Sequence, residues 1–487
     1  MKIIHTDKLD PLDLNQIERE WVYNGLDACV TWEVLETLLP KLNKYTSRTY
    51  NFSRELQGAI LRMRLRGVKV DEEQREAIIE DYENRITKLE VNLERIVREG
   101  CGIQGFSWTS LPDLRYLFYN VMRIPQSRTT KGGQQVMDAK ALDQMEQYVI
   151  AEPIVRHMKR IRELKKRLDV LQQKLDTDGR FRTSYNIAGT TTGRLASSLS
   201  EFGTGGNAQN IEEFLRSMFI ADDGMKMANF DAEQGESRIV GAIEWCLFHD
   251  GKYLDVCESE DIHTIVCRSA WPHVPWTGDL SRDRPIAEKI REGRHNIRFL
   301  SKRLGHGSNY GGLVDTLAAE SGATKKSVQD FQRHYFKAFP SHHMWHQWVR
   351  ERIRFQGYLI TLTGRQRHFW GRRDSDDTIR EAIAYDPQGS LSDVVNQALI
   401  RVCKADICEL LMQCHDSIVV QYPQEMEDEI IPKIMSLLDH RIKLKYDRTL
   451  TIPFGCKTGW NWGEFNAESN RNGLKKYSPG DQRRRES

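Results

Sequence analysis

From residue 294 the chain reads Arg294-His-Asn-Ile-Arg298-Phe-Leu-Ser-Lys302-Arg-Leu-Gly-His306-Gly-Ser-Asn-Tyr310-Gly-Gly312. Every fourth position of this stretch is an arginine, a lysine, a histidine or a tyrosine, and residues four apart share one face of an α-helix. We therefore predict one helix over 284–310 with a stripe of cations that runs into a histidine and a tyrosine. Cations suit a triphosphate, and an aromatic ring suits a base or a sugar. For a generic helix, the alternative is a solvated basic face without a ligand.

Charge is concentrated in two parts of the chain. The 487 residues hold 71 Lys and Arg against 69 Asp and Glu, a net charge of +2, which excludes a histone-like protein but not nucleic-acid binding. Residues 282–303 contain eight basic and three acidic residues, and residues 471–487 contain six basic and two acidic residues. The first segment contains the stripe. The second can contact DNA or a partner, or it can be a solvated tail.

The composition is that of a soluble, folded protein, with 29% charged and 9% aromatic residues. No apolar run approaches the roughly 18 residues of a membrane helix, and the first residues lack the apolar core of a signal peptide. The nine cysteines are dispersed and form no Cys-x-x-Cys pair, so we expect reduced thiols in the core. These features predict an intracellular protein of the cytoplasm or nucleoid (host cytoplasm if the source is viral) without membrane contact.

Two aspartates lie in apolar, strand-like runs. Asp231 ends the run 225–231, and Asp416 lies inside the run 411–421. A carboxylate in such a setting is costly unless it is paired or binds a metal. Two such carboxylates can meet in a sheet and hold two Mg²⁺ ions, which activate a 3′-hydroxyl and stabilise the leaving pyrophosphate. The alternative for each aspartate is a turn or cap residue.

The rest of the chain divides into a helical arm and a region where strands alternate with helices. Periodic apolar residues predict long helices over 70–100 and 153–176, the second very basic. After residue 181 we predict strands over 225–231, 358–363 and 411–421, and helices over 284–310, 325–338, 345–356 and 389–412. Residues 466–487 are basic and contain few apolar residues, so we predict a disordered tail.

Eight motifs occur in one order and resemble those of family A DNA polymerases, the bacterial polymerase-I-like group that includes many phage enzymes. The motif B, A and C equivalents are Arg298-x-x-x-Lys302-x-x-x-His306-x-x-x-Tyr310-Gly311, Asp231-Ala-Glu-Gln234-Gly-Glu236-Ser-Arg238 and His415-Asp416-Ser417. The other five are Thr192-Gly193-Arg194-Leu195 with Asn207-Ala-Gln209-Asn210, Asp261-Ile-His263-Thr, Phe339-Pro340, Thr363-Gly364-Arg365-Gln-Arg367 and Gln388-Gly389-Ser390. One such motif is weak, but eight in family order over about 181–463 are specific.

The resemblance implies an α+β fold shaped like a right hand, with an antiparallel-sheet palm, helical fingers and a helical thumb. The implied domains are a remnant of the C-terminal part of a 3′–5′ exonuclease domain at 1–49, the thumb at 50–180, the first part of the palm at 181–250, the fingers at 251–340, the second part of the palm at 341–465 and the tail at 466–487.

The resemblance also implies roles for residues around the reaction. Asp231 and Asp416 bind two Mg²⁺ ions, for which Mn²⁺ can substitute, and both are catalytic together with Lys302. Six residues are implied to bind the incoming dNTP: Arg298 and Lys302 at the triphosphate, Tyr310 near the templating base, Glu236 against the sugar where it excludes a 2′-hydroxyl, and His306 and Gln234. The residues implied to bind primer–template DNA are Arg194, Asn207, Gln209, Asn210, Gln388, His415 and Arg238.

The function implied is that of a DNA-directed DNA polymerase, a nucleotidyltransferase that extends a primer 3′-OH with dNTPs on a template, in the DNA replication of a phage. Two departures from the family pattern leave alternatives open. Ser417 replaces a usual Glu, and His306 stands where Phe or Tyr is usual. The alternatives are a catalytically weak or inactive nucleic-acid-binding homologue, or a relative of the single-subunit RNA polymerases, against which Glu236 argues.

The N-terminal residues resemble the last motif of the family's proofreading domain. Tyr23, Asp27 and Thr31 match Tyr-x-x-x-Asp-x-x-x-Thr on one helical face. A plain amphipathic helix is the alternative. Residues 1–22 offer no strand carrying the Asp-x-Glu pair that proofreading needs, so we expect no proofreading by this chain alone. A separate exonuclease or processivity polypeptide is a candidate partner.

Overall fold

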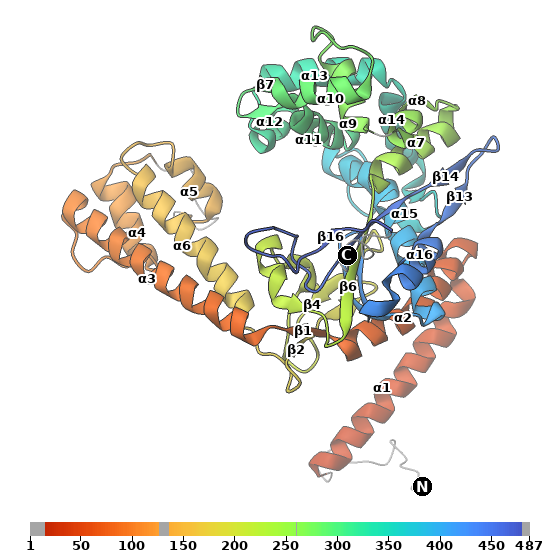
Figure 1. The fold of residues 1–487 in the computed structure, drawn as a ribbon, viewed down its shortest axis with the longest axis horizontal. Coiled ribbons are helices and arrows are strands. Elements are labelled where there is room, and N and C mark those ends of the chain that lie inside the picture. The colour runs from red at the N-terminus through yellow and green to blue at the C-terminus, as the bar shows by residue number, and fades with distance from the viewer. Residues whose placement is uncertain (1–14, 126–135, 260, 480–487) are drawn as a thin grey trace, which may run out of the picture.

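The centre of the protein is an antiparallel sheet of five strands in the order β11-β12-β6-β15-β16, which we call the palm sheet (Figure 1). The computed structural model describes residues 15–125, 136–259 and 261–479. The five strands are β6 (Met225–Ala232), β11 (Glu409–Cys414), β12 (Ser417–Pro423), β15 (Phe454–Gly459) and β16 (Lys475–Lys476). The apolar side chains of β6 and β12 are buried on both faces of this sheet.

The register of the palm sheet brings distant parts of the sequence together. Asp231 of β6 lies opposite Ser417 of β12 on one side and opposite Gly455 of β15 on the other. The predicted single strand over 411–421 is wrong, because the chain turns back at His415 and Asp416 and forms the hairpin β11–β12. Asp416 therefore lies in a turn and not inside a strand.

The arm extends from one side of the palm (Figure 1). Its long helices are α3 (Glu72–Cys101) and α6 (Glu152–Leu171), which confirms the two predicted helices, although the second ends at Leu171. The Asp71 side chain caps the start of α3, and Gly102 ends it in the left-handed conformation. The arm also contains α4 (Leu111–Arg115), the π-helix η3 (Tyr116–Val121) and α5 (Ala139–Met145). A small sheet of β1 (Val68–Val70), β2 (Arg180–Phe181) and β5 (Phe219–Ile220) lies at its base.

Helices α8 to α13 form a second group above the palm sheet, which we call the fingers after the predicted domain (Figure 1). They are α8 (Lys252–Glu258), α9 (Ile262–Ala270), α10 (Leu280–Lys289), α11 (Ile297–Asn309), α12 (Val314–Ser321) and α13 (Lys325–Ala338). The predicted continuous helix over 284–310 is wrong. A hairpin of β7 (Arg291–Glu292) and β8 (His295–Asn296) separates α10 from α11, because Gly293 turns with a φ of 66°. Arg294 lies in this turn, so the helical stripe begins at Arg298.

The remaining elements surround the palm sheet. The helices are α2 (Lys44–Arg66), α7 (Gly235–Phe248), α14 (Ser341–Gln356), α15 (Asp376–Ala405) and α16 (Glu427–Leu438). The strands are β3 (Ser184–Asn186), β4 (Ala196–Ser198), β9 (Tyr358–Ile360), β10 (Gln366–His368), β13 (Arg441–Lys443) and β14 (Thr449–Thr451), and the 3₁₀ turns are η2 (Leu39–Lys41), η4 (Ala208–Asn210), η5 (Glu213–Met218) and η6 (Gln424–Met426). The predicted helix over 389–412 is wrong at both ends, since α15 runs from Asp376 to Ala405. The predicted strand over 358–363 ends at Ile360.

The segment after residue 465 is folded as far as residue 479. Strand β16 pairs with β15, and the backbone N–H of Leu474 donates to Gly463 at 2.6 Å. Leu474 is buried, so this basic segment has an apolar anchor and an open strand edge to pair with. The predicted disorder is therefore wrong for 466–479, and 480–487 lie outside the described residues.

Helix α1 (Gln16–Leu38) extends from the body with no buried side chain (Figure 1). Trp21 and Trp32 are 62% and 60% exposed. Tyr23 and Asp27 lie on this helix. The exonuclease interpretation of 1–49 stays a prediction, and residues 1–14 lie outside the described part of the chain.

The expectation of thiols in the core holds only in part, because Cys29 is exposed and Cys101, Cys246, Cys403 and Cys408 are partly exposed. All nine cysteines are free, and Cys257, Cys267, Cys414 and Cys456 are buried. Among the described helices, none combines the length and the apolar character needed to cross a membrane.

Candidate active site

The two predicted catalytic carboxylates lie side by side at one end of the palm sheet. The backbone N–H of Ala232, next to Asp231, donates to the Asp416 carbonyl at 3.2 Å. Desolvation by the surrounding protein raises the pKa of each carboxyl, although Asp231 is open to solvent from the cleft. The charges of Glu236 and Asp231 raise the pKa of Asp416 further. The pair therefore gains most from a cation placed between the two carboxylates.

The turn that carries Asp416 has an unusual backbone. His415 has a φ of 53°, a conformation that two-residue hairpins usually give to glycine. The Gln413 side-chain amide donates to the His415 carbonyl, which holds the turn in place. Ser417, which replaces the family's usual Glu, turns its hydroxyl back and donates to the Cys414 carbonyl at 2.8 Å. The serine thus stabilises the hairpin, and its hydroxyl is occupied there.

The carboxylate pair suits a particular class of metal. In the described ranges no group of three or more His, Cys, Asp or Glu side chains could hold a metal ion. A metal would thus be held by two protein carboxylates and otherwise by water and substrate oxygens, which is how Mg²⁺ binds with nucleotides. The raised pKa values fit this arrangement, because desolvation outweighs the cations nearby: Arg194, whose Nη2 lies 3.7 Å from Asp416 Oδ1, and Lys457 and Arg216 beside Asp231.

Glu236, near the start of α7, joins this site to the fingers. Its Oε1 accepts a hydrogen bond from Arg194 Nη2 at 2.5 Å, and its Oε2 accepts one from the Tyr310 hydroxyl. His306 Nε2 lies 3.8 Å from the same carboxylate, and the His306 and Tyr310 rings pack edge to face. Burial and the Glu236 charge raise the pKa of Tyr310 well above its usual value. Four predicted residues from three separate motifs therefore meet at one carboxylate.

The two cations of α11 differ in their surroundings. Arg298 Nη2 donates to Asp261 Oδ1 at 3.0 Å, and Asp261 is buried. Lys302 is exposed and makes no ion pair with any described residue. Burial, helped by the charges of Arg298 and Lys302, lowers the pKa of His263 to about 4, so this histidine is neutral. Lys302 is thus the cation of the pair that is open to an anion.

Several predicted DNA-binding residues are held by internal contacts. Gln209 Nε2 donates to Leu195 and to Gln413, and Asn207 Oδ1 accepts from Ser197 Oγ at 2.5 Å. These two side chains therefore order the loop around Arg194. Asn210 and His415 are exposed, and Gln388 is partly exposed on α15.

The motifs at 192–195 and 363–367 pack against α15. A side chain at Gly193 would collide with the Arg365 guanidinium, which Asp393 of α15 holds at 2.6 Å. Asn396 Nδ2 donates to the Gly193 carbonyl at 3.1 Å. These contacts fix the backbone beside Arg194 and explain why a glycine precedes it.

Gln234 and Arg238 lie at the two sides of Glu236 in sequence. Gln234 precedes α7 with a φ of 55°, and its Oε1 is buried without a hydrogen-bond partner. Arg238 Nη1 donates to the Thr451 carbonyl of β14 at 3.4 Å. Residues two apart on a helix point in nearly opposite directions, so Arg238 lies away from the Glu236 group, and this placement does not support a DNA contact.

The sequence of the chain matches DNA polymerase family A over residues 73–464. The chain belongs to this family. It is 26% identical over 460 residues to the thermostable DNA polymerase I of Thermus filiformis, with 89% of this chain and 50% of the relative covered. It is 25% identical over 481 residues to DNA polymerase I of Rhizobium leguminosarum, with 93% and 44% covered. The chain thus spans about half the length of the curated relatives it matches.

A solved structure shares the fold. The polymerase domain of Pol1 from M. smegmatis, in complex with DNA primer-template and dNTP, superposes with a TM-score of 0.68 at 21% identity, covering 84% of this chain and 69% of that chain. The α+β polymerase fold that the sequence predicted is therefore confirmed. The domain boundaries stay predictions.

Three cations beside Asp231 were missed by the sequence reasoning. Arg216, Lys457 and Lys476 line one cleft with Asp231 and His415. Lys476 lies beyond the residues that match family A polymerases, so no family motif indicates it. Lys457 carries no signal either, because it reaches the cleft only through the pairing of β15 with β6.

Proposed function

We propose that this family A chain is a template-directed DNA polymerase that extends a primer 3′-hydroxyl with dNTPs. The observation that carries the proposal is the convergence of Asp231 and Asp416 at one sheet end, linked through Arg194 and Glu236 to Tyr310 of the fingers. The relatives named above are DNA polymerases, and the M. smegmatis domain holds primer-template and dNTP.

In this proposal Asp231 and Asp416 hold two Mg²⁺ ions, and Mn²⁺ can replace them. When bound, the metals lower the pKa of the primer hydroxyl and neutralise charge on the phosphates. The raised pKa values of the free carboxylates support the assignment, since a dication is what this pair lacks. The protein's part is to hold the two carboxylates on adjacent backbone segments of the palm sheet.

The nucleotide is proposed to bind between α11 and Glu236. Lys302 and Arg298 neutralise the triphosphate, and Lys302 is placed for the larger share because Asp261 already occupies Arg298. Glu236 excludes a 2′-hydroxyl from the sugar site, with Gln234 beside it. Tyr310 and His306 form the aromatic wall, and the base pair displaces the hydrogen bond between Tyr310 and Glu236.

The primer–template end is proposed to contact Arg194, Gln388, Asn210 and His415. Asn207 and Gln209 act by ordering the loop around Arg194, as their internal hydrogen bonds indicate. Contacts in the minor groove suit this task, because the acceptors there are shared by all correct base pairs.

Three finer predictions stay open to experiment. They are the role in phage replication, the absence of proofreading by this chain alone, and a separate exonuclease or processivity polypeptide as partner. The proofreading prediction is checked by incubating the protein and Mg²⁺ with a primer that ends in a mismatch. Metal-dependent removal of the mismatched nucleotide would contradict it.

Primer extension with Mg²⁺ tests the proposed function directly. The protein should extend a primed DNA template with dNTPs and not with NTPs, and Asp231→Asn should abolish extension. Extension with NTPs at equal efficiency would favour an RNA polymerase relative. No extension by the unchanged protein, with DNA binding retained, would favour an inactive nucleic-acid-binding homologue.

A further inference from the structure

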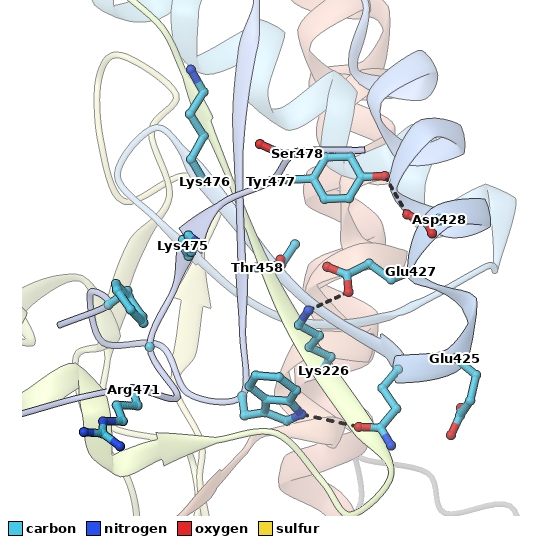
Figure 2. A pocket seen from close by; sticks show the side chains of 14 residues that line it. Lys226, Glu425, Glu427, Asp428, Thr458, Arg471, Lys475, Lys476, Tyr477 and Ser478 are labelled. Atoms are coloured by element: carbon cyan, nitrogen blue, oxygen red, sulfur yellow. Dashed lines mark hydrogen bonds and ion pairs between the residues drawn. The ribbon is translucent and has the colours of Figure 1, made fainter. Parts of the chain in front are cut away.

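The segment at 465–479, which follows the family match, adds the fifth strand to the palm sheet. It is held by several contacts: the Tyr477 backbone N–H donates to the Cys456 carbonyl at 3.0 Å, and the Tyr477 hydroxyl donates to Asp428 at 3.3 Å. Tyr477 and Asp428 line a pocket together with Lys226 and Glu427, which form an ion pair. Figure 2 shows the Tyr477 hydroxyl pointing toward Asp428 in this pocket. Leu474 is buried beneath the same segment. Strand β16 is therefore a fixed part of the palm sheet.

This strand places Lys476 on the same face of the sheet as Asp231. Lys476 lies opposite Lys457, Lys457 lies opposite Asn229, and Asn229 is two residues from Asp231 along β6. Residues opposite each other, or two apart on one strand, point to the same face. Two strand spacings and two residues along the strand put the Cα atoms of Lys476 and Asp231 about 12 Å apart. Lys476 accordingly lines the cleft that contains Asp231, whereas Lys475 does not.

The pairing of Lys476 with Lys457 is unfavourable by itself. Like charges directly opposite each other destabilise a strand pair. Lys457 is compensated by Glu464, whose Oε1 lies 2.5 Å from the lysine Nζ. Lys476 is exposed and makes no ion pair with any residue in the described ranges. An anion above this strand pair would remove the repulsion, so the geometry favours a negatively charged ligand at this position.

The position of Lys476 indicates which anion would bind there, the triphosphate of the nucleotide or a phosphate of the primer. At the proposed reaction centre, the triphosphate lies on the α11 side and the primer lies on the other side of Asp231. Figure 1 shows β16 on the side of β6 that faces the arm, whereas α11 lies above the palm sheet in the fingers. The distance from Asp231 matches a phosphate about two to four nucleotides from the primer terminus, at ~3.4 Å of rise per nucleotide.

We propose that Lys476, supported by Lys457, binds a backbone phosphate of the primer strand a few nucleotides from its 3′ end. This inference rests on the proposed polymerase function, because that function places the primer beside Asp231. The contact reads no base, so it strengthens primer binding on every sequence. It would also hold the 3′-hydroxyl against Asp231 while the fingers exchange nucleotides.

A matched pair of variants tests the proposal. Lys476→Gln and Lys475→Gln remove the same charge from adjacent residues of β16 whose side chains point to opposite faces. Binding of a fluorescent primer–template is measured by anisotropy at several salt concentrations, and thermal unfolding checks that both variants fold. We expect Lys476→Gln to weaken binding about 3–10-fold at low salt and to reduce the salt dependence by about one phosphate contact. Lys475→Gln should change binding less than 2-fold.

Replacing single DNA phosphates by neutral methylphosphonates shows which phosphate Lys476 contacts. Single methylphosphonates are placed at successive positions of the primer, and in parallel of the template strand. With the unchanged protein, a methylphosphonate at one primer position should weaken binding. With Lys476→Gln, the same methylphosphonate should cause little further loss, so the two changes are not additive. Equal binding by both variants, or a matching position on the template strand only, would overturn the inference. Failure of primer extension by the unchanged protein would instead count against the proposed function. The binding comparison of Lys476→Gln with Lys475→Gln does not depend on extension, so it would still test the phosphate contact.

Discussion

Helix α11 of the fingers and the strand pair β15–β16 of the palm sheet carry two basic surfaces, and the cations of both surfaces are arranged in the same way. In each, one cation is bound to a carboxylate of the protein: Arg298 to Asp261 and Lys457 to Glu464. In each, the second cation, Lys302 or Lys476, is exposed without an ion pair among the described residues. The bound cation fixes the surface, and the open cation is available to a substrate phosphate.

The two surfaces differ in how the chain brings their cations together. Lys302 follows Arg298 by one helical turn, so local folding of α11 suffices. Lys476 meets Lys457 only when β16 adds to the sheet. The helical surface belongs to the fingers, where we propose that the nucleotide binds. The sheet surface is fixed relative to Asp231, because β15 and β16 belong to the same sheet as β6.

The largest expected effect comes from Asp231, which belongs to the proposed reaction centre. Asp231→Asn should lower the rate of primer extension by about 10³-fold or more, roughly 4 kcal/mol of transition-state stabilisation, because one metal ligand is lost. Affinity for primer–template should change little, since both basic surfaces remain. Single-turnover extension and anisotropy measure the two quantities.

Glu233→Gln is the matched control for that change. Glu233 is an exposed carboxylate in the same cleft, and its loss should leave the extension rate within about 3-fold, the scale of ordinary surface changes. An equal loss from both variants would show that net charge in the cleft, and not the Asp231 ligand, sets the rate.

The next effect separates the two cations of α11. Lys302→Ala should lower kcat/KM for dNTP about 10²-fold, roughly 2.7 kcal/mol, with little change in stability, because its charge acts on substrate alone. Arg298→Ala should also lower the free energy of unfolding by about 1–3 kcal/mol, because Asp261 is left buried and unpaired. Steady-state kinetics measures kcat/KM, and urea unfolding measures stability.

The control is Arg303→Ala, which removes an exposed cation from the same helix. If Arg298→Ala is as stable as Lys302→Ala, the distinction between bound and open cations is lost.

A smaller effect is expected at Glu236, which accepts hydrogen bonds from Arg194 and Tyr310. Glu236→Ala should reduce the preference for dNTP over NTP about 10–10²-fold, because the sugar site gains room for a 2′-hydroxyl. The ratio of kcat/KM values for the two nucleotides measures it. An unchanged ratio with a lowered extension rate would mean that Glu236 serves only to hold Arg194 and Tyr310.

The smallest effect lies outside both surfaces and concerns stability alone. Asp386 of α15 has its pKa raised to about 6 by burial, although its Oδ1 accepts hydrogen bonds from Leu362 N and Ser390 Oγ. The folded state therefore binds an extra proton between about pH 4 and 6, so this group lowers the free energy of unfolding as pH rises through that window. Asp386→Asn keeps the acceptor oxygen and does not titrate. Its stability relative to the unchanged protein should rise by about 1–2 kcal/mol between about pH 5 and about pH 7.5, measured by urea unfolding. Equal stability at both pH values would refute the assignment.

The sequence predicted those parts of the site that depend on local spacing. Arg298, Lys302 and His306 lie on one helix and Tyr310 directly follows it, as their spacing indicated. The family motifs added Asp231, Asp416, Glu236 and Arg194, and the structure brings these four together. The family itself is confirmed by the match over 73–464.

The predictions failed where a few residues override a pattern. Gly293 ends a helical period that continues on both sides of it, and the turn at His415 and Asp416 interrupts an apolar run that looks continuous. Leu474 orders a basic segment that composition alone marks as disordered. Lys476 could not be predicted, because its place depends on a pairing with β15 that no local pattern encodes.

The register of the palm sheet also constrains synthesis of the protein. Strand β6 is the middle strand, yet both of its neighbours, β12 and β15, are translated long after it. At about 5–20 residues per second, a ribosome needs roughly 10–40 s to pass from Asp231 to Asp416. During that interval β6 is an apolar strand with two unpaired edges, which is a typical target of chaperones and a site of aggregation. The order of the strands that creates the carboxylate pair thus makes the nascent chain dependent on protection until the hairpin β11–β12 arrives.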